Sequence, residues 1–330
     1  MKRIFSGIQP TGGVTLGNYL GAIRNWAALQ EEDYECIYCM VDLHAVTMWQ
    51  DPATLADSTR EVGAALIASG IDPKESIVFN QSKVAAHSQL AWIFNCVARV
   101  GWMNRMTQFK DKAGKNRENA SLGLYAYPAL MAADILIYDS SIVPVGVDQV
   151  QHLEFAQDMA GHFNQTYGDG QELLRRPEIR LSSTPKVPGT DGEKMSTSYG
   201  NTIPLFETGK KLKKLLGKIV TDSTALGEPL DSEDCNVFAL LKLFSDDDEL
   251  ERIASYYRAG ERDGEPFGYG HAKMLLADAI ESHFAPAREK MAHFEAHPEE
   301  VEAVLVNGAA RARPVARATL DRCKKACGLL

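Results

Sequence analysis

The sequence predicts an α/β fold in which a doubly wound parallel sheet is followed by an all-helical domain. Strand-like and helix-like segments alternate through the first half of the 330-residue chain, a pattern typical of βαβ units. From about Leu205 the strand signals disappear and amphipathic helical runs take over. The Gly- and Pro-rich segment Thr184–Gly192 separates the two patterns and is the expected hinge.

Short apolar runs indicate the strands, which are expected at residues 2–7, 35–41, 76–80 and 142–147. Apolar residues at helical spacing predict the intervening helices at 17–30, 51–70, 87–106, 130–138 and 148–167. Asp51-Pro52 is a typical helix start, with Asp as the N-cap and Pro at the first helical position.

The second half predicts helices at 210–220, 237–244, 249–257, 271–284 and 298–326. In the first of these, lysines mark one face, and the other face is marked by Leu212, Leu215, Leu216 and Ile219. We therefore expect domains at residues 1–190 and 191–330, with room for the last helix to pack back on the first domain.

Composition is that of an ordinary globular protein, with 45% hydrophobic and 24% charged residues. The most apolar stretch, 127–147, contains two prolines and two aspartates, and the first residues lack the long apolar region of a signal peptide. These features predict a cytoplasmic protein without a membrane partner. Cys36 and Cys39 have CxxC spacing, but on a strand they would point to opposite faces, so no metal site is predicted.

The net charge is −9, which argues against a protein that binds nucleic acid over its whole surface, and no DNA partner is expected. Positive charge is nevertheless clustered. The three clusters are Arg105, Lys110, Lys112, Lys115 and Arg117; Lys210, Lys211, Lys213, Lys214 and Lys218; and Arg311, Arg313, Arg317, Arg322, Lys324 and Lys325. Solvated helix faces and patches that grip RNA phosphates remain open as interpretations.

Two segments carry features of a nucleotide site. Residues 5–18 form a glycine-rich turn between the first strand and the first helix, where backbone N–H groups can receive phosphate. Gly17 allows close approach of a flat base, and Asn18 can donate to a phosphate oxygen. The segment 194–198 (KMSTS) follows the hinge, and its lysine and hydroxyls could close over a triphosphate.

Together these segments resemble the paired HIGH and KMSKS signatures of class I aminoacyl-tRNA synthetases. The forms SGIQPTG, TLGNYLGAI, MAADIL, VPVGVDQ and KMSTS are most similar to bacterial tryptophanyl-tRNA synthetases, over about residues 2–222. The resemblance implies a Rossmann-like catalytic domain, a helical domain that contacts the tRNA anticodon, and a homodimer. It also implies ATP with Mg²⁺, L-tryptophan and tRNA(Trp) as reactants.

A third segment holds Tyr127, Met131 and Asp134 at spacings that share one helix face. A carboxylate in so apolar a run needs a donor, because an unpaired one is costly to bury. From the residues alone, a helix-dipole partner or an arginine salt bridge is an equally good explanation. By resemblance, Asp134 accepts the indole N–H of tryptophan.

The resemblance also assigns the remaining site residues. Those that match ATP contacts are Gln9, Pro10, Thr11, Gly17, Asn18, Gly146, Val147, Asp148, Val187, Lys194, Met195, Ser196, Thr197 and Ser198. Those that match tryptophan contacts are Phe5, Gln9, His44, Tyr127, Met131, Asp134, Val143, Val145 and Gln149. Catalytic roles fall on Thr15, Asn18, Lys112 and Lys194. Ordinary structural roles stay open, namely core packing for Val143 and Val145, packing or capping for His44, and an N-cap for Asp148.

In such an enzyme the tryptophan carboxylate attacks the α-phosphorus of ATP, and the tRNA 3′ end then attacks the adenylate. Two positions depart from the family pattern: Thr15 replaces the first histidine of HIGH, and Thr197 replaces the second lysine of KMSKS. Three alternatives remain. They are a tyrosyl-tRNA synthetase, a synthetase-like RNA-binding protein without catalysis, and a nicotinamide-dependent oxidoreductase, which the missing GxGxxG fingerprint disfavours.

Overall fold

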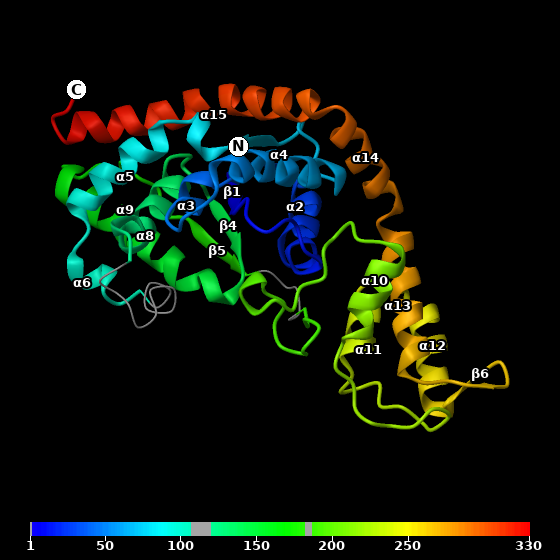
Figure 1. The fold of residues 1–330 in the computed structure, drawn as a ribbon. Coiled ribbons are helices and arrows are strands. Elements are labelled where there is room, and N and C mark those ends of the chain that lie inside the picture. The colour runs from blue at the N-terminus through cyan, green and yellow to red at the C-terminus, as the bar shows by residue number, and fades with distance from the viewer. Residues whose placement is uncertain (1, 107–119, 182–186) are drawn as a thin grey trace. The chain divides into compact units, whose positions relative to one another are not determined.

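The computed structural model describes residues 2–106, 120–181 and 187–330 (Figure 1). The chain divides into two compact units, and each unit combines segments that are distant in sequence. Unit 1 comprises residues 1–13, 25–183 and 294–330, whereas unit 2 comprises 14–24 and 184–293. These units are not separated by a single boundary near residue 190, and the functional division into 1–190 and 191–330 stays a prediction.

A five-stranded parallel sheet forms the centre of unit 1, in the order β3-β2-β1-β4-β5. Its strands are β1 (Lys2–Ile8), β2 (Tyr34–Met40), β3 (Ile77–Asn80), β4 (Ile142–Val145) and β5 (Glu178–Leu181). The chain builds outward from β1 in one direction and then returns to build on the other side, so the predicted doubly wound fold is confirmed. The order reverses between β1 and β4, which is where ligands bind in such sheets.

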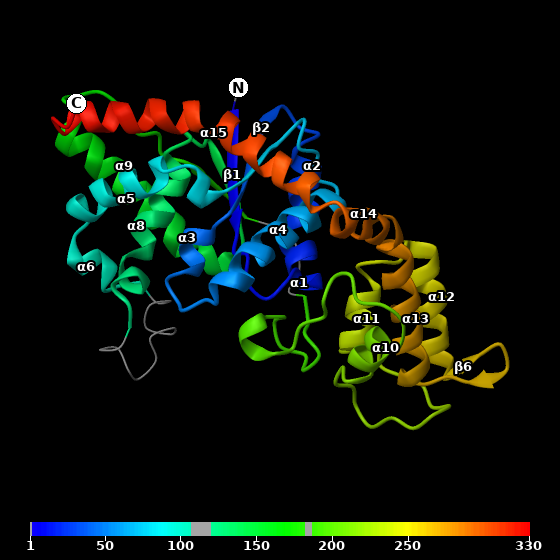
Figure 2. The same cartoon turned by 45° about the horizontal axis from the view of Figure 1, so that its top comes forward.

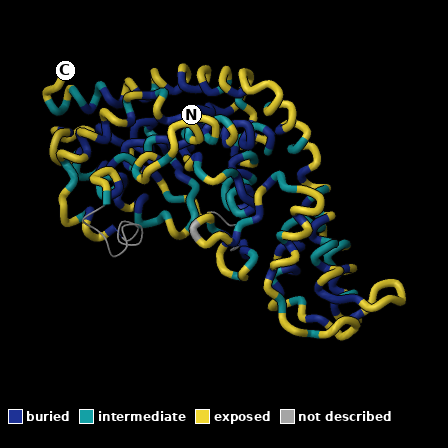
Figure 3. Tube along the Cα trace, viewed as in Figure 1, coloured by how far each residue is buried: buried dark blue, intermediate teal, exposed yellow. Residues whose placement is uncertain are grey.

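The sheet strands are apolar because helices cover both faces of a doubly wound sheet. In β2, every residue from Cys36 to Met40 is buried, and Figure 3 shows the buried stretches of the trace in dark blue. The edge strand β5 was not expected from the sequence, because three of its four residues are exposed and it carries little apolar signal.

Helices of unit 1 largely follow the expected pattern. They are α2 (Arg24–Leu29), α3 (Asp42–Ala45), α4 (Pro52–Ala68), α5 (Ala86–Val97), α6 (Val100–Met103), α8 (Leu122–Leu136), α9 (Val150–Tyr167) and α15 (Pro298–Ala326), with 3₁₀ turns η2 (Gln81–Lys83) and η4 (Val147–Gln149). The single helix expected at 87–106 is instead two, because Ala98 adopts an extended conformation after α5. Asp51 caps α4 by accepting from the Ala53 N–H.

The C-terminal helix α15 packs against β3, α4 and α5 within unit 1 (Figure 2). A Cβ on Gly308 would lie 1.8 Å from the carbonyl oxygen of Val78, so only glycine allows this close approach. Several side chains of the third basic cluster donate to unit 1 groups. Arg311 donates to the Pro73 carbonyl at 2.8 Å, Arg313 to the Lys83 carbonyl at 3.1 Å, and Arg322 to the Leu173 carbonyl at 2.6 Å.

Unit 2 is helical, as predicted for the second half of the chain. Its elements are α1 (Leu16–Asn18), the π-helical turn η1 (Tyr19–Ile23), η5 (Thr197–Tyr199), α10 (Gly209–Gly217), α11 (Asn236–Leu241), α12 (Asp247–Ala259) and α13 (Tyr269–His283). α10 and α11 both pack on α13. Helix α14 (Ala285–Ala296) then leads the chain from unit 2 into unit 1.

A small hairpin of β6 (Glu261–Arg262) and β7 (Glu265–Pro266) was not expected from the sequence. Its turn is Asp263-Gly264, and both residues have positive φ, at 53° and 85°. Asp-Gly between two short strands is a common hairpin turn, so the local signal was present in the sequence. Among the described residues, no helix has the length and apolar character needed to span a membrane.

Candidate functional site

Asp134 lies at the centre of a buried hydrogen-bond network in unit 1. Its side chain comes from α8, and the residue is only 1% exposed. Oδ1 lies 2.6 Å from Gln81 Nε2 and 2.7 Å from His87 Nδ1. Oδ2 lies 2.7 Å from His44 Nε2. Two histidines and one glutamine therefore surround the carboxylate. Among the described residues, no arginine is paired with it.

This network keeps Asp134 ionised at neutral pH. Burial by itself raises the pKa of the carboxyl group, but the hydrogen bonds from His44 and His87 and their electrostatic interaction with the carboxylate outweigh that effect, and the net pKa lies below its usual value. An ionised carboxylate can only accept hydrogen bonds, so the nitrogens that face it donate. The site therefore presents a fixed acceptor in an apolar interior.

The donors reach Asp134 because neighbouring parallel strands end at the same edge of the sheet. His44 lies on α3 directly after β2, and Gln81 begins η2 directly after β3. Two further bonds join these connections. Gln81 Oε1 accepts from the Leu43 N–H at 3.1 Å, and Asp42 accepts from the Ser82 N–H at 2.8 Å.

Aromatic and apolar side chains predicted for the tryptophan pocket gather in the same unit. Phe5 stacks on Tyr138 with ring centroids 5.5 Å apart, and Val143 is 3% exposed. Tyr127 meets His44 edge to face at 6.1 Å, and its hydroxyl lies 2.7 Å from His152 Nε2. Met131 and Val145 are half-buried against the same hydrophobic core.

Other predicted residues of unit 1 lie after β1 and β4. Gln9 is exposed, Pro10 is buried and Thr11 is half-buried. In the turn after β4, Gln149 Nε2 donates to Asp148 Oδ2 at 3.0 Å. A Cβ on Gly146 would lie 2.8 Å from Asp148 Oδ1, at the end of a side chain that can move aside, and Val147 is exposed. Lys112 lies outside the described residues.

Unit 2 brings the two nucleotide signatures together. Thr15 caps α1: its Oγ1 accepts from the Asn18 N–H at 3.2 Å, while Asn18 Oδ1 accepts from the Thr15 N–H at 2.9 Å. The second of these bonds, together with the Thr15 hydroxyl, which donates to Asn18 Oδ1 at 2.8 Å, fixes the Asn18 amide with its oxygen turned toward the cap. The Nδ2 group is then the end that can donate to a ligand. The Gly17 N–H approaches Met195 Sδ at 3.2 Å, which joins the two segments.

The KMSTS segment is held by Asn201, a residue that no sequence motif singled out. Asn201 is 2% exposed. Its Nδ2 donates to Asp191 Oδ1 at 2.7 Å and to the Lys194 carbonyl at 3.2 Å, and its Oδ1 accepts from the Ser196 N–H at 2.8 Å.

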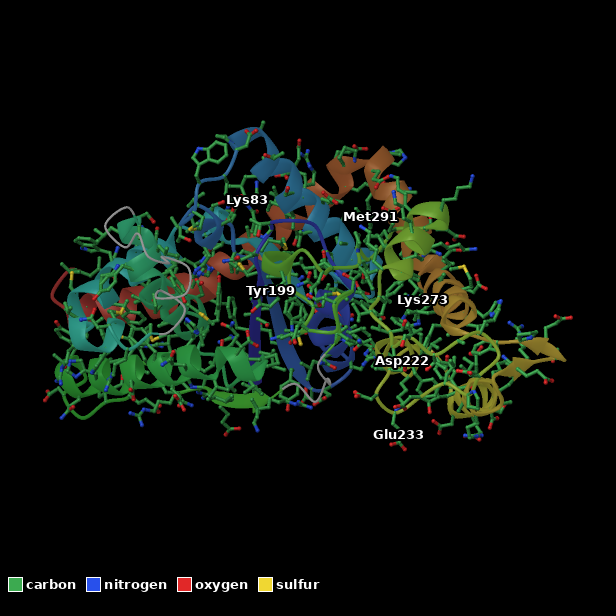
Figure 4. All side chains as sticks on the ribbon, turned by 60° about the horizontal axis from the view of Figure 1, so that its bottom comes forward. Lys83, Tyr199, Asp222, Glu233, Lys273 and Met291 are labelled. Carbon is green, nitrogen blue, oxygen red and sulfur yellow. The ribbon has the colours of Figure 1, made fainter. Side chains whose placement is uncertain are left out.

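The backbone of the segment is also tied to the hinge. The Met195 N–H donates to the Val187 carbonyl at 2.9 Å, and Val187 is buried. Lys194 and Thr197 are exposed. Figure 4 labels Tyr199, which ends η5 after this segment.

The structure thus places the predicted tryptophan contacts in unit 1, and Thr15–Asn18 together with Val187 and Lys194–Ser198 in unit 2. It adds residues that sequence reasoning missed, namely Gln81, His87, Tyr138, His152 and Asn201. Gln81 could have been found, because Asn80-Gln81-Ser82 is a polar run at the end of a predicted strand. The long-range partners of His87 left no signal in the sequence. Asn201 lies within ten residues of its partners, but no motif singled it out.

Comparisons with known proteins agree with this arrangement. Residues 1–285 match the family model of tRNA synthetases class I (W and Y). A tryptophan--tRNA ligase of Rhodopirellula baltica is 44% identical over 327 residues, covering 99% of each chain. One from Brucella melitensis is 42% identical, covering 99% of this chain and 98% of the relative.

Solved structures give the same result. Tryptophanyl-tRNA synthetase of Campylobacter jejuni, complexed with ADP and tryptophan, superposes with a TM-score of 0.90 at 39% identity, covering 99% of this chain and all of that one. A tyrosyl-tRNA synthetase of Archaeoglobus fulgidus has a TM-score of 0.66 at 18% identity over 88% of this chain and 90% of that one, which shows a shared fold. The chain belongs to the class I tRNA synthetases of the tryptophan and tyrosine (W and Y) family.

Proposed function

We propose that this protein is a tryptophan--tRNA ligase, which activates L-tryptophan with ATP and transfers it to the 3′ end of tRNA(Trp). Relatives of that name are 42–44% identical over nearly the whole chain, and the Campylobacter jejuni structure holds ADP and tryptophan. A tyrosyl enzyme is not favoured, because the full-length relatives at 42–44% identity are tryptophan--tRNA ligases.

The observation that carries the amino-acid assignment is the state of Asp134. An ionised carboxylate offers about four acceptor positions, and Gln81, His87 and His44 occupy three of them. The remaining position lies on Oδ2. The indole N–H of tryptophan is a donor and nothing else, so it fits this acceptor. Phe5, Tyr127 and the valines of β4 supply apolar surface for the ring.

The nucleotide is assigned to the segments joined in unit 2. Asn18 Nδ2 is directed by its own cap to act as a donor, and Lys194 brings a positive charge that neutralises phosphate. Gly146, Val147 and Asp148 follow β4 at the edge where the strand order reverses, which suits contacts to ribose and adenine.

The reaction needs no side-chain nucleophile. A carboxylate oxygen of tryptophan attacks the α-phosphorus of ATP, the bond to the bridging oxygen breaks, and pyrophosphate leaves with the electron pair. A terminal ribose hydroxyl of tRNA then attacks the activated carbonyl, AMP leaves, and the hydroxyl proton passes to solvent or to AMP. Holding reactants in attack geometry contributes about 7–11 kcal/mol to such reactions.

Mg²⁺ enters this proposal with the nucleotide. Within the parts of the chain that the structure describes, no three His, Cys, Asp or Glu side chains gather in a way that could hold a metal ion. Mg²⁺ is commonly bound through substrate phosphates with few protein ligands. This chain's own part is therefore to hold ATP through Asn18, Lys194 and backbone N–H groups.

ATP–pyrophosphate exchange with each standard amino acid in turn tests the proposal. We expect exchange with tryptophan alone, followed by charging of tRNA(Trp) when the tRNA is added. Exchange with tyrosine would replace the assignment. No amino-acid-dependent exchange, together with tRNA binding, would identify a non-catalytic RNA-binding protein. The family also supports a homodimer acting in the cytoplasm, and sedimentation equilibrium of the purified chain tests its oligomeric state.

A further inference from the structure

Three side chains from three different elements hold the Asp134 carboxylate. His44 comes from α3, Gln81 from η2 and His87 from α5, and all three are at least nine-tenths buried. Their arrangement is unequal. Among the described residues, Oδ1 receives two of the donors, at 2.6 and 2.7 Å, whereas Oδ2 receives one, from His44. Oδ1 is therefore saturated, and Oδ2 alone keeps capacity for a ligand.

Gln81 is fixed at both ends of its amide. Its Oε1 accepts from the Leu43 N–H at 3.1 Å, and its Nε2 donates to Asp134 Oδ1. Reversing the amide would place its oxygen against a carboxylate and its NH₂ group against a donor, so one orientation is strongly favoured. The Gln81 side chain thus links Leu43, in the connection after β2, to Asp134 on helix α8 in one fixed orientation.

His87 is fixed in the same way. Its Nδ1 donates to Asp134 Oδ1, and its Nε2 lies 2.7 Å from the hydroxyl of Tyr138. The Tyr138 ring in turn stacks on Phe5, a residue expected to line the tryptophan pocket. The carboxylate, the imidazole and the pocket wall therefore form one continuous packed chain.

We propose that Gln81 and His87 are positioning residues that saturate Asp134 Oδ1 and so aim Oδ2 at the indole N–H, which makes them determinants of selectivity for tryptophan. This inference rests on the proposed function. Without Gln81 or His87, the carboxylate can rotate toward the vacated donor position or take up a proton. A rotated acceptor is misaligned, and a protonated one presents an O–H to the indole N–H. Either change weakens recognition of the N–H while leaving ring packing in place.

The test compares tryptophan with 3-(1-benzothiophen-3-yl)alanine, in which sulfur replaces the N–H with little change of shape. ATP–pyrophosphate exchange gives kcat/KM for each amino acid, and their ratio measures recognition of the N–H. We expect Gln81→Met and His87→Leu to lower this ratio about tenfold or more, through loss for tryptophan and little change for the analogue. The KM for ATP should stay as in the wild type.

His87→Asn keeps an N–H at the position of Nδ1 and should restore part of the ratio. Ser88→Ala is the matched control, because Ser88 is exposed on α5 and donates to the Ala85 carbonyl of the same turn; its ratio should equal that of the wild type. Equal losses for both amino acids, or an unchanged ratio in Gln81→Met and His87→Leu, would overturn the proposal. A wild-type protein that exchanges without preferring tryptophan would instead overturn the proposed function.

Discussion

Asn201 is the residue whose loss should most directly loosen the KMSTS segment. Its side chain makes three hydrogen bonds, to the Asp191 carboxylate, the Lys194 carbonyl and the Ser196 N–H. Asn201→Ala removes all three. A neutral hydrogen bond contributes about 0.5–1.5 kcal/mol and one to a charged group about 1.5–3 kcal/mol. Asp191 and Ser196 are not fully buried and can regain water, so we expect a net loss of about 1–3 kcal/mol.

That loss should appear in the use of ATP. If the segment must be ordered over the triphosphate, about 1–3 kcal/mol corresponds to a 5- to 150-fold fall in kcat/KM for ATP. ATP–pyrophosphate exchange at saturating tryptophan measures it. Binding of tryptophan alone, measured by equilibrium dialysis, should stay unchanged, because the Asp134 network involves neither Asn201 nor its partners.

Gly189→Ala provides an independent route to the same result. A Cβ on Gly189 would lie 2.3 Å from Asn201 Nδ2 and 2.8 Å from the Asn201 carbonyl oxygen, so Asn201 has to move. Thr202→Ala, one residue beyond Asn201, serves as the control. Wild-type ATP kinetics in both Asn201→Ala and Gly189→Ala, or a parallel loss of tryptophan binding, would refute the reasoning.

Three further predictions concern stability, tRNA and the catalytic loop. Gly308→Ala should lower the free energy of unfolding by about 1–3 kcal/mol or more, because its Cβ meets the Val78 carbonyl; an unchanged denaturant midpoint would contradict this. Lys210→Gln with Lys214→Gln, exposed on α10, should raise the KM for tRNA with exchange unaffected. The slope of tRNA affinity against salt should become shallower by about 0.7–0.9 for each phosphate that the lysines no longer neutralise, and equal slopes would show a merely solvated face. Thr197→Lys should raise the activation rate measured as single-turnover pyrophosphate release, because it restores a cation to the loop, and no change or a fall would count against that role.

Much of the fold could be predicted because hydrophobic periodicity is a local property. The runs that became β1, β2, β3 and β4 are apolar since parallel strands are covered on both faces. The exposed edge strand β5 lacked that signal. The break between α5 and α6 depends on the backbone of Ala98, which helical spacing alone cannot reveal.

By itself the sequence determined that Asp134, set in an apolar run, needed hydrogen-bond donors, because an unpaired buried carboxylate costs too much free energy. It also carried the glycine-rich turn and the KMSTS segment as short contiguous motifs. Only the tertiary structure decided which donors reach Asp134. Residues 44, 81 and 87 meet the carboxylate because neighbouring strands end at one edge of the sheet. Packing likewise decided that arginines of α15 donate to main-chain carbonyls of unit 1. A cluster of charges in the sequence does not show which groups those charges contact.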